Sequence, residues 1–214
     1  MIIKGSTAVI TGAASGIGQA TAFDLASRGA KAIAMVDITD NVADVTAEMN
    51  KKEGREVGRA FQGDVTDAAF RKEVYDAMCG DDGVVNICVP SAGIFRDRLS
   101  VMLDKETGEP DIYPVEMFHQ VLEVNLVAPV YWALELVARM AHNRKVNGKK
   151  KWHPDETVQG TVVFIGSVAS QGNKGQISYS STKAALEGAA QTLMKESMFH
   201  GVRTAVIHPG FVDT

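Results

Sequence analysis

The sequence has little cysteine and no excess of positive charge, and each shortage excludes a class of protein. Cys79 and Cys88 are the only cysteines among 214 residues, and their spacing fits neither a disulfide framework nor a metal site. The net charge of -4 and the isoelectric point near 5.7 argue against a basic surface for nucleic acid. We therefore expect no metal, no nucleic-acid partner and a reducing, cytoplasmic setting.

Long apolar runs and targeting signals are also scarce. No apolar run reaches the ~18 residues of a membrane helix, and the N-terminus leads directly into a strand-like segment. We expect neither a signal peptide nor a membrane partner. A hydrophobic content of 45% over 214 residues instead predicts one domain, residues 1–214, with one substantial core.

Short apolar runs alternate along the chain with longer segments of helical period. The runs are apolar almost throughout, as in parallel strands that are covered on both faces. This alternation predicts a Rossmann-like, doubly wound parallel α/β sheet with helices on both faces. The expected strands are residues 7–11, 32–36, 57–61, 84–89, 161–165 and 204–207.

Two long helices and two polar stretches complete the pattern. The helices are expected near residues 115–142 and 178–199. The stretches 96–114 and 143–160 contain glycine and proline breakers, so we expect loops there. Three consecutive lysines at positions 149–151 are interpreted as a solvated loop in preference to an anion site.

A glycine-rich turn follows the first expected strand and reads Thr-Gly-Ala-Ala-Ser-Gly-Ile-Gly over residues 11–18. Glycine lets the backbone approach a pyrophosphate without a Cβ in the way. The helix that follows offers free N–H groups and a positive dipole end. We predict that this turn binds the phosphates of a dinucleotide, with a turn that binds no ligand as the alternative. The predicted contacts are Gly12, Ser15, Gly16, Ile17 and Gly18.

Asp37 ends the second expected strand, nineteen residues after Gly18. An acid about 20 residues beyond such a turn holds the ribose hydroxyls of a dinucleotide. A carboxylate repels a 2′-phosphate, and the glycine turn contains no lysine or arginine to neutralise one. We therefore expect NAD(H) as the cofactor in preference to NADP(H). A helix cap or a solvated strand end is the alternative role for Asp37.

Tyr179 and Lys183 stand four residues apart at the start of a helical segment, and Ser167 lies twelve residues before Tyr179. Positions i and i+4 share one helix face, so the phenol and the ammonium can point into one pocket. A nearby cation lowers the pKa of a tyrosine from its usual ~10. With the Ser167 hydroxyl holding a substrate oxygen, these residues suit proton transfer to a carbonyl or from an alcohol.

These residues together resemble the single-domain short-chain dehydrogenase/reductase family. The family motif T-G-x-x-x-G-x-G matches residues 11–18, and its Asn, Ser, Tyr and Lys tetrad matches four positions here. The catalytic residues implied are Asn125, Ser167, Tyr179 and Lys183. The family's acid after the third strand and its P-G-x-V-x-T motif also have counterparts. The cofactor contacts implied beyond the glycine turn and Asp37 are Asp64, Val65, Ser91, Ala92, Gly93, Tyr179, Lys183, Val212 and Thr214.

Two departures from the family pattern have consequences. The motif N-N-A-G appears as Pro-Ser-Ala-Gly over residues 90–93, so we expect weaker hydrogen bonds bracing the sheet. Family members commonly run ~250 residues, whereas this chain has 214. We expect the C-terminal substrate-loop region to be absent, with the last strand and helix.

The resemblance implies hydride transfer between a nicotinamide and a carbon that bears oxygen. Tyr179 would donate or accept the proton, Lys183 would lower the pKa of Tyr179 and hold the nicotinamide ribose, and Ser167 would position the substrate oxygen. Asn125 would interrupt its helix to hold a water molecule. The implied substrate is a secondary alcohol or ketone, with 3-hydroxyacyl or 3-oxoacyl thioesters as candidates. The implied assembly is a homotetramer or homodimer formed through the two long helices.

Three alternatives remain open at this point. The first is an NADPH-dependent 3-oxoacyl-carrier-protein reductase of the same family. The second is a catalytically silent regulator that senses nucleotide on the same fold, although such proteins typically lack the tyrosine or lysine. The third is an epimerase or dehydratase of the extended family, but such proteins use T-G-x-x-G-x-x-G and a larger C-terminal domain, and neither is seen in this sequence.

Overall fold

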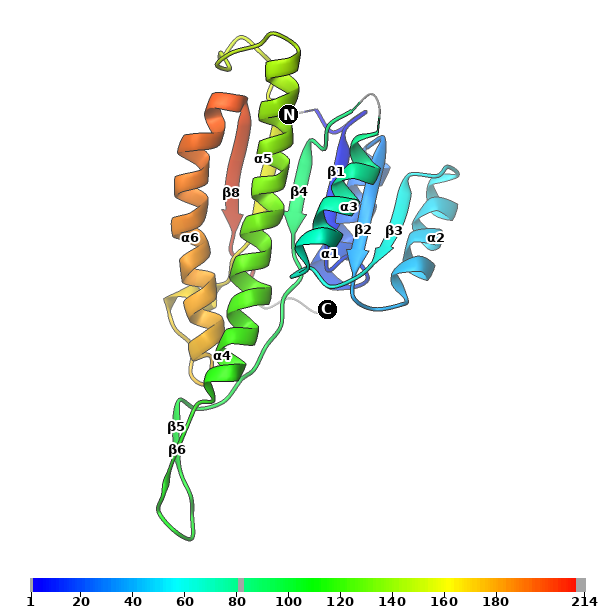
Figure 1. Cartoon of the computed structure of the whole chain (residues 1–214). Helices are drawn as coiled ribbons and strands as arrows, with labels where there is room; N and C mark the ends of the chain where they lie inside the picture. The colour runs from blue at the N-terminus through cyan, green and yellow to red at the C-terminus, as the bar shows by residue number, and fades with distance from the viewer. Residues whose placement is uncertain (1, 81–82, 211–214) are drawn as a thin grey trace.

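A six-stranded parallel sheet forms the centre of the molecule (Figure 1). The computed structural model describes residues 2–80 and 83–210. The strands of the sheet are β1 (Thr7–Thr11), β2 (Ala32–Asp37), β3 (Gly58–Gln62), β4 (Ile87–Pro90), β7 (Gly160–Ile165) and β8 (Val202–Ile207). Their order is β3-β2-β1-β4-β7-β8, so the direction of winding reverses between β1 and β4. Doubly wound sheets bind ligands at the carboxyl edge beside this switch point.

Helices cover both faces of the sheet, which confirms the predicted fold class. The helices are α1 (Gly16–Ser27), α2 (Val42–Glu53), α3 (Ala68–Cys79), α4 (Val115–Leu122), η1 (Glu123–Val127), α5 (Ala128–Val146), η2 (Val168–Gln171), α6 (Ile177–Ser197) and η3 (Met198–His200). Buried side chains of α1 and α2 belong to one apolar cluster, and those of α3, α5 and α6 belong to a second. Trp132 and Tyr75 are the largest fully buried side chains of the second cluster.

Helices cover both faces of the sheet in its middle, but only one face at the edge formed by β7 and β8. Strands β1 and β4 are buried at every residue. In β7 and β8, buried residues alternate with more exposed ones. The reason is that α5 and α6 cover one face of this edge, while α1 and α2 pack against β1 and β2.

The stretch 96–114 differs from the plain loop that the sequence indicates. It contains an antiparallel hairpin of β5 (Val101–Leu103) and β6 (Pro110–Ile112). Figure 1 shows the hairpin as an arm that projects from the body of the molecule near α4. Strands of three exposed residues have no core-facing periodicity, so the sequence pattern gives no sign of them.

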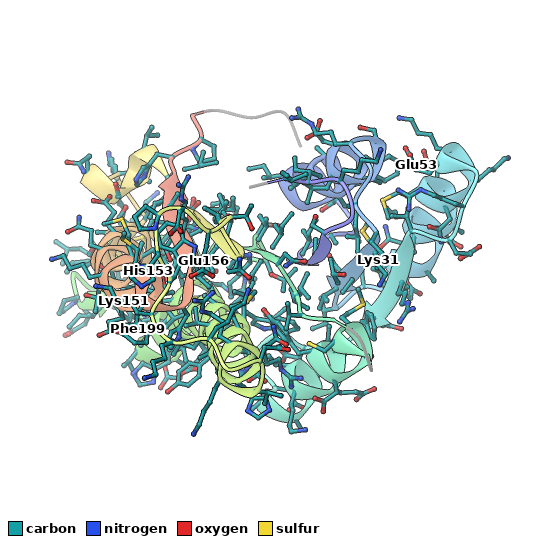
Figure 2. The ribbon with its side chains drawn as sticks, turned by 90° about the horizontal axis from the view of Figure 1, so that it is seen from above. Lys31, Glu53, Lys151, His153, Glu156 and Phe199 are labelled. Atoms are coloured by element: carbon teal, nitrogen blue, oxygen red, sulfur yellow. The ribbon has the colours of Figure 1, made fainter. Side chains whose placement is uncertain are left out.

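The stretch 143–160 is the expected loop only from residue 147 to residue 159, because α5 continues to Val146 and β7 begins at Gly160. A buried arginine of α5 anchors this loop. Arg144 is only 2% exposed, pairs with Glu156 at 2.9 Å and donates to the Lys150 carbonyl at 3.1 Å. Figure 2 shows Lys151 and Glu156 on the α5–α6 side of the molecule. The lysines of this loop are therefore carried on a fixed backbone.

The expectation that no apolar stretch reaches the length of a membrane helix is wrong. Helices α4, η1 and α5 form one continuous helix, Val115–Val146, whose 32 residues are long and apolar enough to span a membrane. Core helices have the same length and composition, and Trp132, Leu136 and Met140 of this helix are buried. Only 39% of its most apolar window is buried, so much of its surface is open.

Candidate active site

The glycine turn after β1 has a backbone that only glycine accommodates. Gly12 has a φ of 64°, and a Cβ there would lie 2.8 Å from the Ala92 backbone. A Cβ on Gly18 would lie 2.2 Å from the Gly12 carbonyl oxygen. The N-cap of α1, Ser15, makes no side-chain capping hydrogen bond, and the first turn carries no acid. The start of α1 therefore suits an anionic phosphate.

A cleft of about 1010 Å³ opens at the carboxyl edge of the sheet, beside the switch point. The predicted cofactor-binding residues that line it are Gly12, Ser15, Gly16, Ile17, Gly18, Asp37, Asp64, Val65, Ser91, Ala92, Gly93, Tyr179 and Lys183. The predicted contacts Val212 and Thr214 lie outside the described residues. Across residues 2–80 and 83–210, no group of three or more His, Cys, Asp or Glu side chains is placed to hold a metal ion.

Two aspartates stand at the β2–β3 side of the cleft, and hydrogen bonds hold the carboxylate of each. Asp37 accepts from the Ala14 amide at 3.0 Å with one oxygen, and from the Thr39 amide at 3.1 Å and hydroxyl at 2.9 Å with the other. A carboxylate offers about four acceptor positions, so Asp37 keeps room for one further donor without rearrangement. Asp64 accepts from the Thr66 amide at 2.9 Å and hydroxyl at 2.8 Å.

The Pro-Ser-Ala-Gly sequence at the end of β4 makes two hydrogen bonds that brace the sheet. The Ser91 hydroxyl donates to the Thr11 carbonyl at 2.5 Å, and the Ala92 amide donates to the Thr11 hydroxyl at 3.1 Å. These bonds join the ends of β1 and β4 at the base of the cleft. Serine and backbone groups thus supply the hydrogen bonds that asparagine side chains were expected to provide.

Tyr179 and Lys183 lie on adjacent turns of α6 and both line the cleft. The Lys183 Nζ atom lies 5.4 Å from the centroid of the Tyr179 ring. The same ammonium donates to the Ile165 carbonyl at 2.7 Å and is only 6% exposed. Burial lowers the pKa of Lys183 to about 8.

The pKa of Tyr179 is raised above 10.0 in the free protein, and the expected lowering by Lys183 is therefore wrong for this state. Burial of the phenol is the largest cause, a hydrogen bond with Ser167 opposes it, and the charge of Asp97 adds to it. Lys183 does not contribute to this shift, because with a pKa of about 8 it has lost its charge before the phenol titrates. The phenol therefore keeps its proton near neutral pH.

Ser167 and Asn125 support the wall of the cleft from behind. Ser167 is the N-cap of η2 and accepts from the Ala169 amide at 3.1 Å. Asn125 is fully buried at the centre of the π-helical turn η1, which confirms that it interrupts its helix. Its side chain accepts from the Ile94 amide at 2.8 Å and donates to the Ile94 carbonyl at 2.9 Å. These two bonds hold the segment that leaves β4.

One wall of the cleft was not predicted from the sequence. Phe95 lies against Tyr179 with the ring centroids 4.6 Å apart and an interplanar angle of 32°. Side chains of α4 complete this wall, and only an aromatic residue just beyond a strand end could have indicated it. The lining residues of this wall are Ile94, Phe95, Arg96, Glu116, His119, Gln120, Glu123 and Val124.

Comparison with known proteins agrees with this geometry. Residues 6–214 match the family described as short chain dehydrogenase. The chain is 31% identical to the 3-oxoacyl-[acyl-carrier-protein] reductase FabG of Escherichia coli (strain K12), over 100% of this chain and 76% of that protein. The reductase of the same name from Thermotoga maritima is 30% identical, over 100% of this chain and 77% of that protein.

The chain therefore belongs to the short chain dehydrogenase family. It is an oxidoreductase that acts on CH–OH or keto groups with a nicotinamide cofactor. The glycine turn, the cleft and the Tyr179–Lys183 pair fit such a cofactor, because all of them line one cleft. At the turn, glycine has no Cβ, so a pyrophosphate can approach the backbone closely.

Proposed function

We propose that this chain interconverts a secondary alcohol and a ketone with NAD(H), and that Tyr179 is the general acid and base. The observation that carries the proposal is the placement of Tyr179 and Lys183 in the same cleft as the glycine turn. A phenol that keeps its proton in the free protein suits donation to a carbonyl oxygen in the reducing direction. In the oxidising direction the same atom would accept the proton of the alcohol.

The other residues of the tetrad have supporting roles in this proposal. Ser167, hydrogen-bonded to Tyr179, would hold the substrate oxygen beside the phenol. Lys183 would hold the nicotinamide ribose and supply positive charge. Asn125 would interrupt its helix to hold a water molecule, and that water would relay protons between Lys183 and solvent. When bound, the nicotinamide supplies the hydride chemistry, and the protein supplies position and electrostatics.

Each part of the cofactor has residues that would hold it. The glycine turn would hold the pyrophosphate, Asp37 a ribose hydroxyl, and Asp64 with Val65 the adenine. The backbone after β4 would lie along the nicotinamide ribose. Val212 and Thr214, which lie outside the described residues, are proposed as further cofactor contacts from the sequence motif alone. Asp37 is the reason for preferring NAD(H), since it lines the cleft and no basic side chain stands in the glycine turn to offset it.

A 3-oxoacyl or 3-hydroxyacyl thioester is the substrate class that we propose. The relatives are named as 3-oxoacyl-[acyl-carrier-protein] reductases and align over the whole chain. This supports a thioester substrate whose keto group is on carbon 3 of the acyl chain. The same observation favours the second candidate function, an NADPH-dependent 3-oxoacyl-carrier-protein reductase. Asp37 distinguishes the two candidates, because the second requires room for a 2′-phosphate.

Turnover of acetoacetyl-CoA with NADH and with NADPH tests these proposals together. We expect reduction with NADH to exceed that with NADPH, and Tyr179→Phe to abolish turnover while the variant still binds NADH. Higher activity with NADPH would favour the second candidate. NADH binding without turnover on a panel of ketones would instead indicate a nucleotide-sensing regulator.

We also propose a homodimer or homotetramer in a cytoplasmic setting, acting as a single catalytic domain. The α5 and α6 helices present a shallow groove whose lining includes Val130, Leu134, Gly188 and Ala189. Gly188 and Ala189 are small, and small residues permit close approach of another helix. Light scattering that gives a single ~23 kDa species would contradict an oligomer.

A further inference from the structure

One face of the β5–β6 arm is apolar and open to water. The register pairs Val101 with Ile112 and Leu103 with Pro110, so these four side chains share one face of the hairpin. Val101, Leu103 and Ile112 are 57%, 66% and 69% exposed. A two-stranded hairpin is marginally stable alone, and an exposed apolar strand promotes association. The arm has the surface of an element that packs against another molecule.

The turn at the tip of this arm is acidic. Asp104, Glu106 and Glu109 are exposed there, with Lys105 as the only cation of the turn. The Asp104 carboxylate accepts from the Glu106 and Thr107 amides and so shapes the turn. Glu106 and Glu109 are thus the carboxylates that can be altered without removing the turn's own hydrogen bonds.

The opposite end of the long helix carries the reverse charge. Exposed lysines lie on its last turn and on the loop that follows. The ion pair between Arg144 and Glu156 holds the backbone of this loop. Asp155 is the one exposed carboxylate among them. Val146, on the last turn of α5, is 69% exposed and offers apolar surface beside the charges. The exposed lysines are Lys145, Lys149, Lys150 and Lys151.

An open face of α5 connects these two ends. Tyr131, Leu134, Ala138, His142 and Lys145 are exposed and recur at spacings of three and four, so they lie on one side of the helix. A helix of 32 residues spans about 48 Å at 1.5 Å per residue. Figure 1 shows the arm near one end of this helix and the 143–160 loop at the other.

We propose that the arm of one copy docks on the 143–160 loop of a second copy, with the two long helices packed antiparallel. A twofold axis across the helices exchanges their ends. Each acidic arm tip then meets the lysines of the partner copy, and each apolar arm face meets the surface around Val146. A parallel arrangement would place acid beside acid and lysine beside lysine. This proposal rests on the proposed homo-oligomer. It adds that the contact between arm and loop makes the two long helices pack antiparallel.

Charge reversal at both ends tests the contact on the 214-residue chain. Lys150→Glu with Lys151→Glu reverses the loop, and Glu106→Lys with Glu109→Lys reverses the arm. In sedimentation equilibrium at low salt, each pair should raise the dimer dissociation constant about tenfold or more, because twofold symmetry repeats every contact. The quadruple variant should return to within about threefold of the wild type.

The control is Lys51→Glu with Lys52→Glu on α2, which reverses two exposed lysines far from this surface and should leave the dissociation constant unchanged. The wild-type dimer should also weaken as salt rises, since screening removes the attraction. This measurement needs no variant, so a variant that fails to fold by circular dichroism leaves the proposal testable.

Three results would overturn the proposal in distinguishable ways. A wild-type chain that stays monomeric removes the homo-oligomer and this contact together. A dimer that neither charge reversal nor salt affects, or a quadruple variant no tighter than the double variants, removes this contact alone. Binding of the monomeric chain to anionic lipid vesicles, lost in the Lys150→Glu with Lys151→Glu variant, would assign the open helix and its lysines to a membrane surface.

Discussion

Tyr179 and Lys183 are both withdrawn from water, and burial acts on them in opposite directions. It raises the pKa of the Tyr179 phenol and lowers that of the Lys183 ammonium to about 8. Both shifts favour the neutral form, as desolvation always does. The sequence could place the two residues on one helix face, because spacing is local. It could not predict the direction of the tyrosine shift, because burial depends on Phe95 and on the rest of the fold.

Replacing Lys183 by methionine should change how stability depends on pH. The unfolded lysine has a pKa of 10.5 and the folded one about 8, so between these values the unfolded chain binds more protons. This group therefore makes the folded state more stable as pH rises through that window. The wild type should gain roughly 1–3 kcal/mol relative to Lys183→Met between pH 8 and pH 10.5.

Urea unfolding at several pH values measures this difference. Lys195→Met is the matched control, because Lys195 lies on the same helix and is exposed. Cys88 titrates in the same region with the opposite effect: its buried thiol has a pKa of about 12, so it costs stability above pH 9. That background is common to all the variants. A constant difference between wild type and Lys183→Met across the window would contradict the assigned pKa.

Asp37→Asn should erode the preference for NADH over NADPH by roughly tenfold, because it removes the repulsion of a 2′-phosphate. Asparagine has one acceptor oxygen, so it keeps the bond from either the Ala14 or the Thr39 amide and loses the other; that loss affects both cofactors alike. The ratio of kcat/KM with the two cofactors is the measurement. Asp40→Asn, an exposed neighbour, should leave the ratio unchanged. An unchanged ratio in Asp37→Asn would show that cofactor choice is decided elsewhere.

At the scale of elements, the segment between β4 and α4 forms one wall of the cleft. The Tyr113 hydroxyl lies 2.7 Å from the Arg96 carbonyl, to which it donates, and 2.9 Å from the Ser178 hydroxyl. Gln176 donates to Asp97 at 2.8 Å. These contacts tie the segment to the start of α6, so Phe95 is held against Tyr179 by the residues that follow it.

Phe95→Ala should lower kcat/KM for ketone reduction and move its alkaline limb to lower pH. Loss of the aromatic contact with Tyr179 should lower kcat/KM roughly 2–10-fold. The phenol becomes more exposed, so the burial that raises the Tyr179 pKa is reduced. The pH profile of kcat/KM measures both effects, and Phe95→Tyr should restore the wild-type profile. A lower rate with an unmoved limb would mean that Phe95 contacts substrate without covering the phenol.

The elements also show where sequence patterns stop being informative. Strands β1 and β7 end where the apolar runs predicted, because buried parallel strands are read directly from composition. The β5–β6 hairpin gave no signal, since its apolar face packs on nothing within the described chain. The bracing of β1 by Ser91 was also missed, because it depends on two strands meeting at the switch point.

At the scale of the whole molecule, the doubly wound class followed from the alternation of elements, and two apolar clusters pack against the one six-stranded sheet. The cleft is a property of this arrangement: its residues come from segments between Gly12 and Lys183, which only the switch point brings together. Motif spacing anticipated most of this lining. The α4 wall was missed because the path of the arm-bearing segment decides which side of α4 faces the cleft.

One cooperative unit should follow from this packing, and the two tryptophans can test it. Trp132 is buried between α3, α5 and the sheet, with its indole donating to the Val65 carbonyl at 2.9 Å. Trp152 is in the 143–160 loop, where its amide donates to the Phe199 carbonyl at 2.8 Å. In Trp132→Phe and Trp152→Phe variants, the fluorescence of the remaining tryptophan should report the same urea midpoint as circular dichroism of that variant. A lower midpoint for Trp152 than for the backbone signal would mean that the loop end of α5 and α6 unfolds separately, and the chain would then hold more than one cooperative unit.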